Sequence, residues 1–314
     1  MPRNAFLRPW QADALLLSVA AVWGATFPVV KNATDLSQGG VPTYWFLAAR
    51  FTAAALLLAL VYRRRLAAAS WRTWAAGGLV GLFLYAAYAL QTFGLAYTSS
   101  TKASFITGLN VVLVPIFSVL WLRRPPGLGA WLGVTTATVG LALLSLSGGD
   151  LHFSYGDLLV LMCAVGFALH VVAVGRFAGP HDPVALAVIQ LIVTALLSGI
   201  SHLLTHGSLG PGVPEVHWWS GPAHVIPALL ICSVFATAAA FLLQNVLQPF
   251  TTPTHTALIF SAEPVFGALF SFLLMGETLT PREYVGAALM VLGMILAELP
   301  VWQREPRAAA YPDQ

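Results

Sequence analysis

One carboxylate stands inside a long apolar segment, residues 256–277, near the C-terminal end of the chain. Glu263 is the only charged residue among the first 20 residues of this segment, and Pro264 follows it directly. At about 1.5 Å per residue, these residues span the ~30 Å hydrocarbon core of a bilayer. An ionisable side chain at that depth usually faces a bundle interior or a water-filled cavity. Because Pro264 cannot donate to the carbonyl of Phe260, we expect a helix kink and a free acceptor beside Glu263, at the wall of a polar cavity.

A cation, Arg50, also lies inside an apolar segment, residues 43–62. It could receive a substrate carboxylate through its planar fork, or pair with Glu263 while the site is empty. It could equally be a structural arginine that is satisfied by backbone carbonyls or reaches the outer interface. Glu263 likewise has two interpretations. Desolvation favours its neutral form, so it could take up and release protons, or it could be a permanently protonated or arginine-paired strut.

Other polar and aromatic residues are weaker candidates. His170 could relay protons or be a packed, hydrogen-bonded histidine. Trp23 and Phe27 lie one helical turn apart and could line a substrate path or serve ordinary packing. His202 and His206 have the spacing of a metal pair, but no glutamate follows the first and no third ligand is evident, so we expect no metal and no cofactor. The sequence has no Walker loop, GxSxG elbow or HExxH motif, so nothing indicates ATP-driven transport or hydrolysis.

The composition points to a membrane protein. Of 314 residues, 58% are hydrophobic and only 9% are charged, whereas about 25% of a soluble protein is charged. The net charge of +3 comes from basic residues that cluster between apolar segments and form no single face, so we expect a lipid bilayer and no nucleic acid as partner. Cys163 and Cys232 both fall inside apolar segments and are predicted to be unpaired thiols.

Ten apolar segments alternate with breaks that carry Gly, Pro or Arg. They are residues 12–30, 43–62, 74–96, 101–121, 128–146, 157–177, 183–204, 224–247, 254–275 and 284–300. With the N-terminus inside, the inner connections and both chain ends hold 11 of the 15 Lys and Arg residues, and the outer connections hold Lys31, Lys102 and Arg282. This bias predicts cytoplasmic termini, including the tail 303–314. Arginine greatly outnumbers lysine, as we expect for a GC-rich bacterium, and we therefore expect a bacterial inner membrane.

The two halves of the chain match without a gap when residues 86–143 are shifted by 153 positions. The matched pairs include Leu90-Gln91 with Leu243-Gln244, Thr98 with Thr251, Ile106 with Ile259, Gly133 with Gly286 and Gly140 with Gly293. Each half holds five segments, an odd number, so the second copy must enter the membrane from the opposite side. The sequence predicts an all-α integral membrane fold of ten helices in two inverted repeats, 1–147 and 148–302, followed by a cytoplasmic tail, 303–314.

The repeat also pairs polar positions between the halves. With the shift of 153 positions, Asn110 matches Glu263, both near mid-depth, and Gln91 matches Gln244, the first toward the outer mouth and the second toward the inner one. Aligning segment 43–62 with 183–204 pairs Arg50 with Gln190, and aligning 12–30 with 157–177 brings Thr26 within one residue of His170. We predict that these residues, with Trp23 and Phe27, lie along one water-filled path at the repeat interface. Pro115 and Pro264 are predicted to permit the bending of the helices that line the path.

Several motifs carry a resemblance to a known family. They are Trp23-Gly24-Ala25-Thr26-Phe27, Ala49-Arg50-Phe51, Thr98-Ser99-Ser100 through Ser104-Phe105-Ile106, Ala262-Glu263-Pro264-Val265-Phe266 and Gly276-Glu277. With these motifs in order, nearly the whole chain resembles the EamA-type permeases of the drug/metabolite transporter superfamily. The resemblance implies ten helices, the first four of each half lining a central cavity, in a protein that moves amino acids, other metabolites or toxic compounds. Arg123-Arg124 stands where the family pattern leads us to expect Gly-Glu, so any role of a carboxylate there does not carry over.

Three functional hypotheses follow. The first is a secondary, non-ATP transporter of a small-molecule substrate, most simply an exporter of amino acids or related metabolites, working by alternating access with protons as a possible coupling ion. A monomer and a homodimer are both compatible with it. The second is an intramembrane enzyme that uses Glu263, His170 or the His202/His206 pair, and the third is a channel or membrane scaffold. We favour the transporter, because the sequence shows no nucleophile or metal constellation for the second hypothesis.

Overall fold

A computed structural model gives the arrangement of residues 9–98, 103, 106–123, 126–145, 154–213, 215–221, 223–275 and 280–298. These residues form helices and connections, with no strand among them. The expected domain boundary at 147/148, the tail 303–314, Gly276-Glu277 and the serine motif around residues 99–105 lie outside the described residues, apart from position 103. The all-helical prediction is confirmed for the part of the chain that the structure describes.

Six helical stretches in that part are long and apolar enough to cross a membrane by length and composition. They are α1 (Pro9–Thr34), α2 (Thr43–Val61), α4 (Trp71–Leu95), α8 (Tyr155–Phe177), α9 (Pro183–His206) and the continuous stretch Val225–Phe250. That last stretch comprises α10 (Val225–Ser233), the π-helical turn η3 (Val234–Ala239), α11 (Ala240–Leu247) and the 3-10 turn η4 (Gln248–Phe250).

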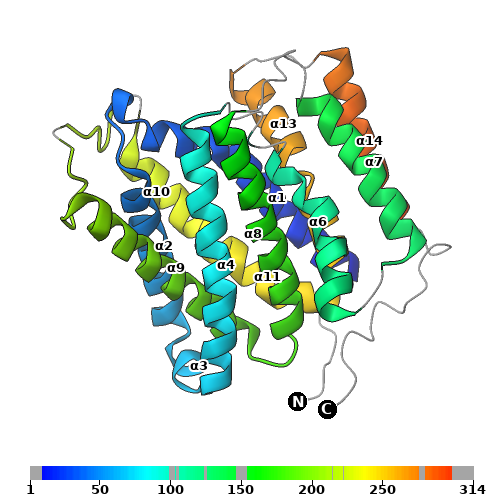
Figure 1. Ribbon diagram of the computed structural model, residues 1–314, viewed down its shortest axis with the longest axis horizontal. Coiled ribbons are helices and arrows are strands. Elements are labelled where there is room, and N and C mark those ends of the chain that lie inside the picture. Colours follow the sequence, from blue (N-terminus) through cyan, green and yellow to red (C-terminus); the bar gives the residue numbers. More distant parts are fainter. Residues whose placement is uncertain are drawn as a thin grey trace.

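Shorter elements complete the bundle. They are the 3-10 turn η1 (Leu36–Gln38), α3 (Arg63–Ala67), α6 (Asn110–Phe117), the π-helical turn η2 (Ser118–Leu122), α7 (Leu128–Ser145), α12 (Pro253–Phe260), α13 (Glu263–Met275) and α14 (Pro281–Glu298). Each predicted apolar segment overlaps at least one helix of the structure. The helices pack in a bundle in which α2 contacts α9, α4 contacts α8 and α9, and α7 and α14 lie together at one edge (Figure 1).

Capping residues set the ends of two long helices. At α8, the Ser154 side chain accepts from the backbone N–H of Asp157, whose carboxylate in turn accepts from the backbone N–H of Ser154. This capping box satisfies two N–H groups that have no partner within the helix. At α9, Asp182 accepts from the backbone of Val184 and Ala185. These caps fix where two of the longest helices begin.

The predicted segment 254–275 is interrupted rather than kinked. α12 ends at Phe260, Ser261 and Ala262 form a turn, and α13 begins at Glu263. Pro264 therefore lies in the first turn of a new helix. Backbone N–H groups in a first turn have no acceptor within the helix, so the lack of an N–H on proline costs no hydrogen bond there. Our expectation of a mid-helix kink at Pro264 was wrong, because the chain restarts its helix one residue earlier.

A matching interruption occurs at the repeat-related position in the first half. Residues 106–108 are helical, Leu109 forms a turn, and α6 begins at Asn110. The two polar residues that the sequence register pairs, Asn110 and Glu263, thus each open the second part of a broken helix. Pro115 lies inside α6, three residues before the π-helical turn η2.

Helices α7 and α14 approach each other through two reciprocal glycine contacts. A Cβ added to Gly140 would lie 2.5 Å from the carbonyl oxygen of Gly286, and one added to Gly293 would lie 2.6 Å from that of Gly133. Only glycine permits the two backbones to lie this close. A shift of 153 positions takes Gly140 to Gly293 and Gly133 to Gly286, so the repeat relates one contact to the other.

Candidate substrate cavity

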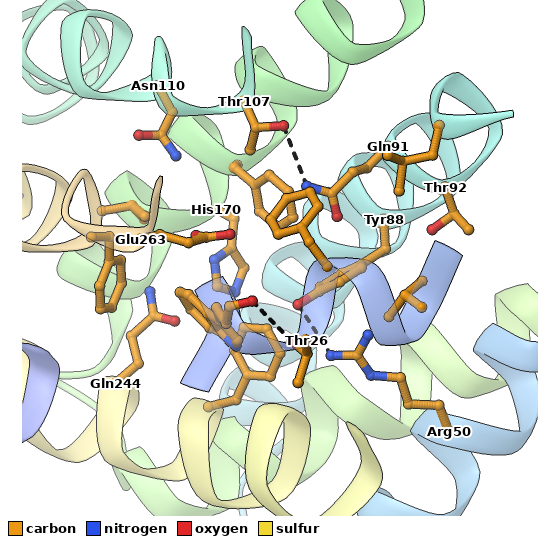
Figure 2. Close-up of a pocket in the computed structure, with 18 residues that line it drawn as sticks. Thr26, Arg50, Tyr88, Gln91, Thr92, Thr107, Asn110, His170, Gln244 and Glu263 are labelled. Atoms are coloured by element: carbon orange, nitrogen blue, oxygen red, sulfur yellow. Dashed lines mark hydrogen bonds between the residues drawn. The ribbon is translucent and has the colours of Figure 1, made fainter. Parts of the chain in front are cut away.

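A small cavity lies between helices of the two halves of the chain (Figure 2). The space open to the centres of water-sized molecules is about 60 Å³, which is room for a few waters. Its walls come from α1, α2, α4, the interrupted segment around Leu109, α8, α11, α12 and α13. The lining residues are Trp23, Thr26, Phe27, Val30, Arg50, Tyr88, Gln91, Thr92, Leu95, Thr107, Asn110, Phe167, His170, Val171, Phe241, Gln244, Phe260 and Glu263.

The structure brings all the sequence-predicted cavity residues except Gln190 to this one space. Gln190 is fully buried behind the wall, where its Oε1 lies 2.9 Å from Nε2 of His170. When the histidine Nε2 donates to that oxygen, the other ring nitrogen, Nδ1, is the acceptor of the neutral ring. Gln190 therefore orients His170 instead of lining the path, which corrects our expectation for this residue.

Arg50 is held on one edge by the second half of the chain. Its Nε donates to Thr237 Oγ1 at 2.6 Å, and its Nη2 donates to the Ala236 carbonyl at 3.2 Å. Nη2 also lies 3.5 Å from the Tyr88 hydroxyl, and the guanidinium stacks 4.9 Å from the centroid of the Tyr88 ring. Nη1 has no hydrogen-bond partner in the described part of the chain. The arginine thus has structural partners and retains a free terminal group.

The π-helical turn η3 explains why the Ala236 carbonyl is available. The N–H of Ala240 bonds to the carbonyls of Phe235 and Thr237, and not to that of Ala236 four residues back. The Ala236 oxygen accepts instead from Arg50 and, at 2.9 Å, from the indole Nε1 of Trp23. Single π turns inside α-helices are frequent at functional sites. This one joins α1 and α2 of the first half to a helix of the second.

Glu263 lies at the wall of the cavity, positioned by the close approach of α1 to α13. A Cβ on Gly24 would collide with the Glu263 carbonyl and lie 2.8 Å from the backbone nitrogen of Gly267. The Glu263 carboxylate has no hydrogen bond or ion pair with any described residue. Its position depends on the backbone of α13 and not on side-chain partners.

Arg50 and Glu263 lie at opposite sides of the cavity. In Figure 2, Glu263 lies toward the side of Asn110 and Gln244, whereas Arg50 lies on the far side of Thr26. The two residues form no ion pair in the structure, so the pairing that the sequence left open is not adopted here. A guanidinium and a carboxyl group therefore face one small space without contacting each other.

Gln91 and Gln244, which the repeat pairs, line the cavity on different sides (Figure 2). Gln91 Nε2 donates to Thr107 Oγ1 at 3.3 Å, across the first interrupted helix. Gln244 Nε2 donates to Gln248 Oε1 at 3.2 Å, and Gln248 Nε2 donates to the Val171 carbonyl at 2.6 Å. The oxygens of Asn110 and Gln244 are buried without a partner among the described residues. These unpaired acceptors leave hydrogen-bonding capacity at the cavity wall.

Aromatic rings cover much of the remaining wall, and most of them were not among the residues predicted from the sequence. Tyr88 and Phe167 are in edge contact at 5.2 Å between centroids, and Trp23 contacts Phe241 at 5.5 Å and Phe260 at 4.9 Å. Tyr88 lies one turn before Gln91 on α4. Phe167 lies one turn before His170 on α8. Helical spacing from these polar residues would have found both rings.

The histidine pair on α9 lies away from the cavity. The rings of His202 and His206 stack at 4.6 Å, and His202 Nε2 contacts the Gly210 carbonyl at 2.8 Å. Among the described residues, no group of three His, Cys, Asp or Glu side chains is arranged to hold a metal ion. Cys163 and Cys232 are buried free thiols.

Comparison with known proteins places the chain in a family. The model of the EamA-like transporter family matches residues 10–146 and again residues 154–299. An uncharacterised transporter from Archaeoglobus fulgidus is 35% identical over 290 residues, which cover 92% of this chain and 86% of that protein. The threonine/homoserine exporter RhtA of Escherichia coli strain K12 is 29% identical over 188 residues, which cover 58% of this chain and 57% of RhtA.

A solved crystal structure shares the fold, with a TM-score of 0.75 at 20% sequence identity, over 95% of this chain and 100% of the other. The family matches and the apolar helices together indicate a multi-pass membrane protein and confirm the resemblance drawn from the motifs. The chain belongs to the EamA-like transporter family.

Proposed function

We propose that this protein is a secondary transporter that exports small metabolites bearing both a carboxylate and an amino group, such as amino acids, by alternating access and without enzymatic activity. The observation that carries the proposal is the separation of Arg50 and Glu263 across one cavity. A solute with opposite charges at its two ends satisfies both residues at once. The limited volume of the cavity favours small solutes.

Arg50 is the proposed receptor for the substrate carboxylate. Its Nε and Nη2 are engaged by Thr237 and Ala236, so the guanidinium is oriented before the substrate arrives, and Nη1 remains available. A hydrogen bond between charged groups is roughly twice as strong as a neutral one. Because Arg50 is only 2% exposed, a substrate carboxylate that reaches it exchanges water for a fixed cation in a desolvated site.

Glu263 is the proposed partner of the substrate ammonium group. The carboxylate has no competing partner among the described residues, and the oxygens of Asn110 and Gln244 are further acceptors on the same side of the cavity. An ammonium group has three donors and no acceptor, so a cluster of acceptors suits it. A proton on Glu263 would compete with the ammonium group for the carboxylate. The rate of transport would then depend on pH.

We propose an inverted repeat of five helices, 1–147 and 148–302, as the basis of alternating access. The reciprocal glycine contacts of α7 and α14 support it, as do the paired interruptions at Asn110 and Glu263. The packing of α1 on α13 and α11 also corresponds to the packing of α8 on α6 and α4. Repeats of this kind rock against each other around a site near mid-membrane.

The proposed setting is the inner membrane of a bacterium, with both termini in the cytoplasm. The uneven distribution of Lys and Arg supports this orientation. Export is the proposed direction because RhtA, a partial match, is a threonine/homoserine exporter. Arg50 and Glu263 would then first receive the substrate from the cytoplasmic side.

A thermal-shift panel tests the proposed substrate class. Each amino acid is compared with the amine that lacks its carboxylate and with the acid that lacks its amino group. Ligands that bind the folded state raise the melting temperature. We expect amino acids to stabilise the wild type more than their analogues do, Arg50→Gln to abolish the preference for the carboxylate and Glu263→Gln to abolish the preference for the amine. If zwitterions stabilise no better than single-charge analogues, the substrate assignment is wrong.

A further inference from the structure

A second, open cleft lies at the end of the bundle where α2, α3 and α4 are joined, and it shares no lining residue with the central cavity. It measures about 680 Å³ and lies between the α3–α4 connection and the turn that precedes α9. In Figure 1, α3 is at the lower tip of the molecule, below α2 and α4. The lining residues are Arg64, Arg65, Ala68, Ala69, Ser70, Arg72, Thr73, Pro180, His181 and Asp182.

The cleft carries an excess of positive charge. Its one carboxylate, Asp182, is already engaged: Oδ2 lies 3.3 Å from Nη1 of Arg65, and Oδ1 accepts from two backbone N–H groups of α9. His181 is also engaged, with Nδ1 lying 3.0 Å from the Phe177 carbonyl. Arg64 and Arg72 have no carboxylate partner within the described part of the chain. Two guanidinium groups are thus available to an anion.

The walls next to the cleft are apolar and exposed. Trp71 is 75% exposed, Leu60 is 72% exposed and Val61 is 62% exposed at the adjoining ends of α4 and α2. The Arg72 guanidinium lies over the Trp71 ring, 5.9 Å from its centroid. Tryptophan is enriched where the lipid headgroups meet the acyl chains. The basic cleft therefore lies at the level of the headgroups, with a lipid-facing surface beside it.

We propose that this cleft binds the phosphate of an anionic phospholipid headgroup, with the acyl chains lying along Trp71 and Leu60. The planar fork of arginine matches the oxygens of a phosphate group. Basic pockets between helices at a membrane surface bind such headgroups. A bound lipid bridges α3 to the turn before α9 and so supports the contact between α2 and α9. The proposal goes beyond the proposed function and does not depend on it.

Arg63 is a matched control for the charge of this region. It belongs to the same run of three arginines and is exposed, but it does not line the cleft. A general attraction of basic residues to anionic membranes predicts equal effects for Arg63→Gln and Arg64→Gln. A defined headgroup site predicts that only the residues lining the cleft matter.

Native mass spectrometry of the purified, delipidated protein tests the site. Phosphatidylglycerol and phosphatidylethanolamine with identical acyl chains are added separately, and glycerol phosphate is added as a soluble competitor. We expect phosphatidylglycerol to bind in preference. Arg64→Gln and Arg72→Gln should each weaken its binding by about fivefold, as expected for one basic residue near a charged headgroup. Arg63→Gln should change it by less than about twofold.

Three outcomes would overturn the proposal. Equal binding of the two lipids would exclude an anionic site, and equal losses in Arg63→Gln and Arg64→Gln would exclude a defined one. Displacement of the lipid by glycerol phosphate at equal concentration would assign the cleft to a soluble phosphate instead. Thermal melting of each variant without lipid is the control for folding, and it should match the wild type because these side chains are exposed.

Discussion

The Arg50 guanidinium is joined to Thr237 by a 2.6 Å hydrogen bond from Nε to Oγ1, with both side chains almost fully buried. The bond links α2 of the first half to the π-helical turn η3 of the second. Together with the Ala236 carbonyl, it orients Arg50, the one cation among the described residues that line the central cavity. The position of the Arg50 guanidinium therefore depends on the geometry of η3.

Replacing Thr237 by Val should weaken this arrangement. Val keeps the shape of Thr but removes the acceptor, so Arg50 loses a hydrogen bond to a charged group that contributes about 1.5–3 kcal/mol. We expect a lower melting temperature and a reduced response to ligands that carry a carboxylate. Thr237→Ser retains the hydroxyl and should restore the ligand response. Equal impairment by Ser and Val would mean that Thr237 acts through its methyl group and not through Arg50.

Gly24→Ala should displace Glu263. The new Cβ would collide with the Glu263 carbonyl, so α1 and α13 must separate. Gly78→Ala in α4 is the matched control, because a Cβ there has nothing within 4 Å and the change favours the helix by about 0.5–1 kcal/mol. Thermal melting and substrate binding should both suffer in Gly24→Ala, whereas Gly78→Ala should be neutral or stabilising. Normal binding by Gly24→Ala would show that α13 tolerates the shift.

Transport should depend on pH through Glu263. The proposed role requires the ionised carboxylate, so acidification that protonates it should reduce the initial rate of amino-acid transport. Glu263→Gln is neutral at every pH and should give a low rate with little pH dependence. Glu215→Gln, which removes an exposed carboxylate outside the cavity, should retain the wild-type profile. An unchanged profile in Glu263→Gln would assign the titration to another group.

Cysteine labelling in intact cells should report the orientation. The native Cys163 and Cys232 are buried and should give little background. In the proposed topology, Ser208→Cys after α9 lies outside and should react with a membrane-impermeant maleimide. Ala68→Cys after α3 should react only after the cells are permeabilised. Both positions are exposed in the structure, so the reverse pattern would show that the chain is oriented the other way.

The sequence was sufficient to locate the helices and most of the polar cavity residues, because apolar periodicity and the shift of 153 positions mark both. It did not reveal that Gln190 lies behind His170, because that placement depends on a contact between two helices, α8 and α9. The close approach of Gly24 to the Glu263 carbonyl, beside the interruption, is a contact between segments far apart in the chain. The π-helical turn at Ala236 likewise has no local sequence signal. It frees the Ala236 carbonyl, which accepts hydrogen bonds from Arg50 and Trp23, and both of these donors lie far away in the sequence.

Counterflow in proteoliposomes tests whether the protein carries amino acids through a site formed by Arg50 and Glu263. Vesicles are filled with an unlabelled amino acid identified in the ligand panel, the same labelled compound is added outside at low concentration, and no ATP or ion gradient is present. We expect transient, saturable accumulation of the label in wild-type vesicles, and no accumulation in Arg50→Gln and Glu263→Gln variants that melt as folded proteins. Accumulation that persists in both variants would rule out the proposed site, and continuous non-saturable flux through the wild type would rule out a transporter.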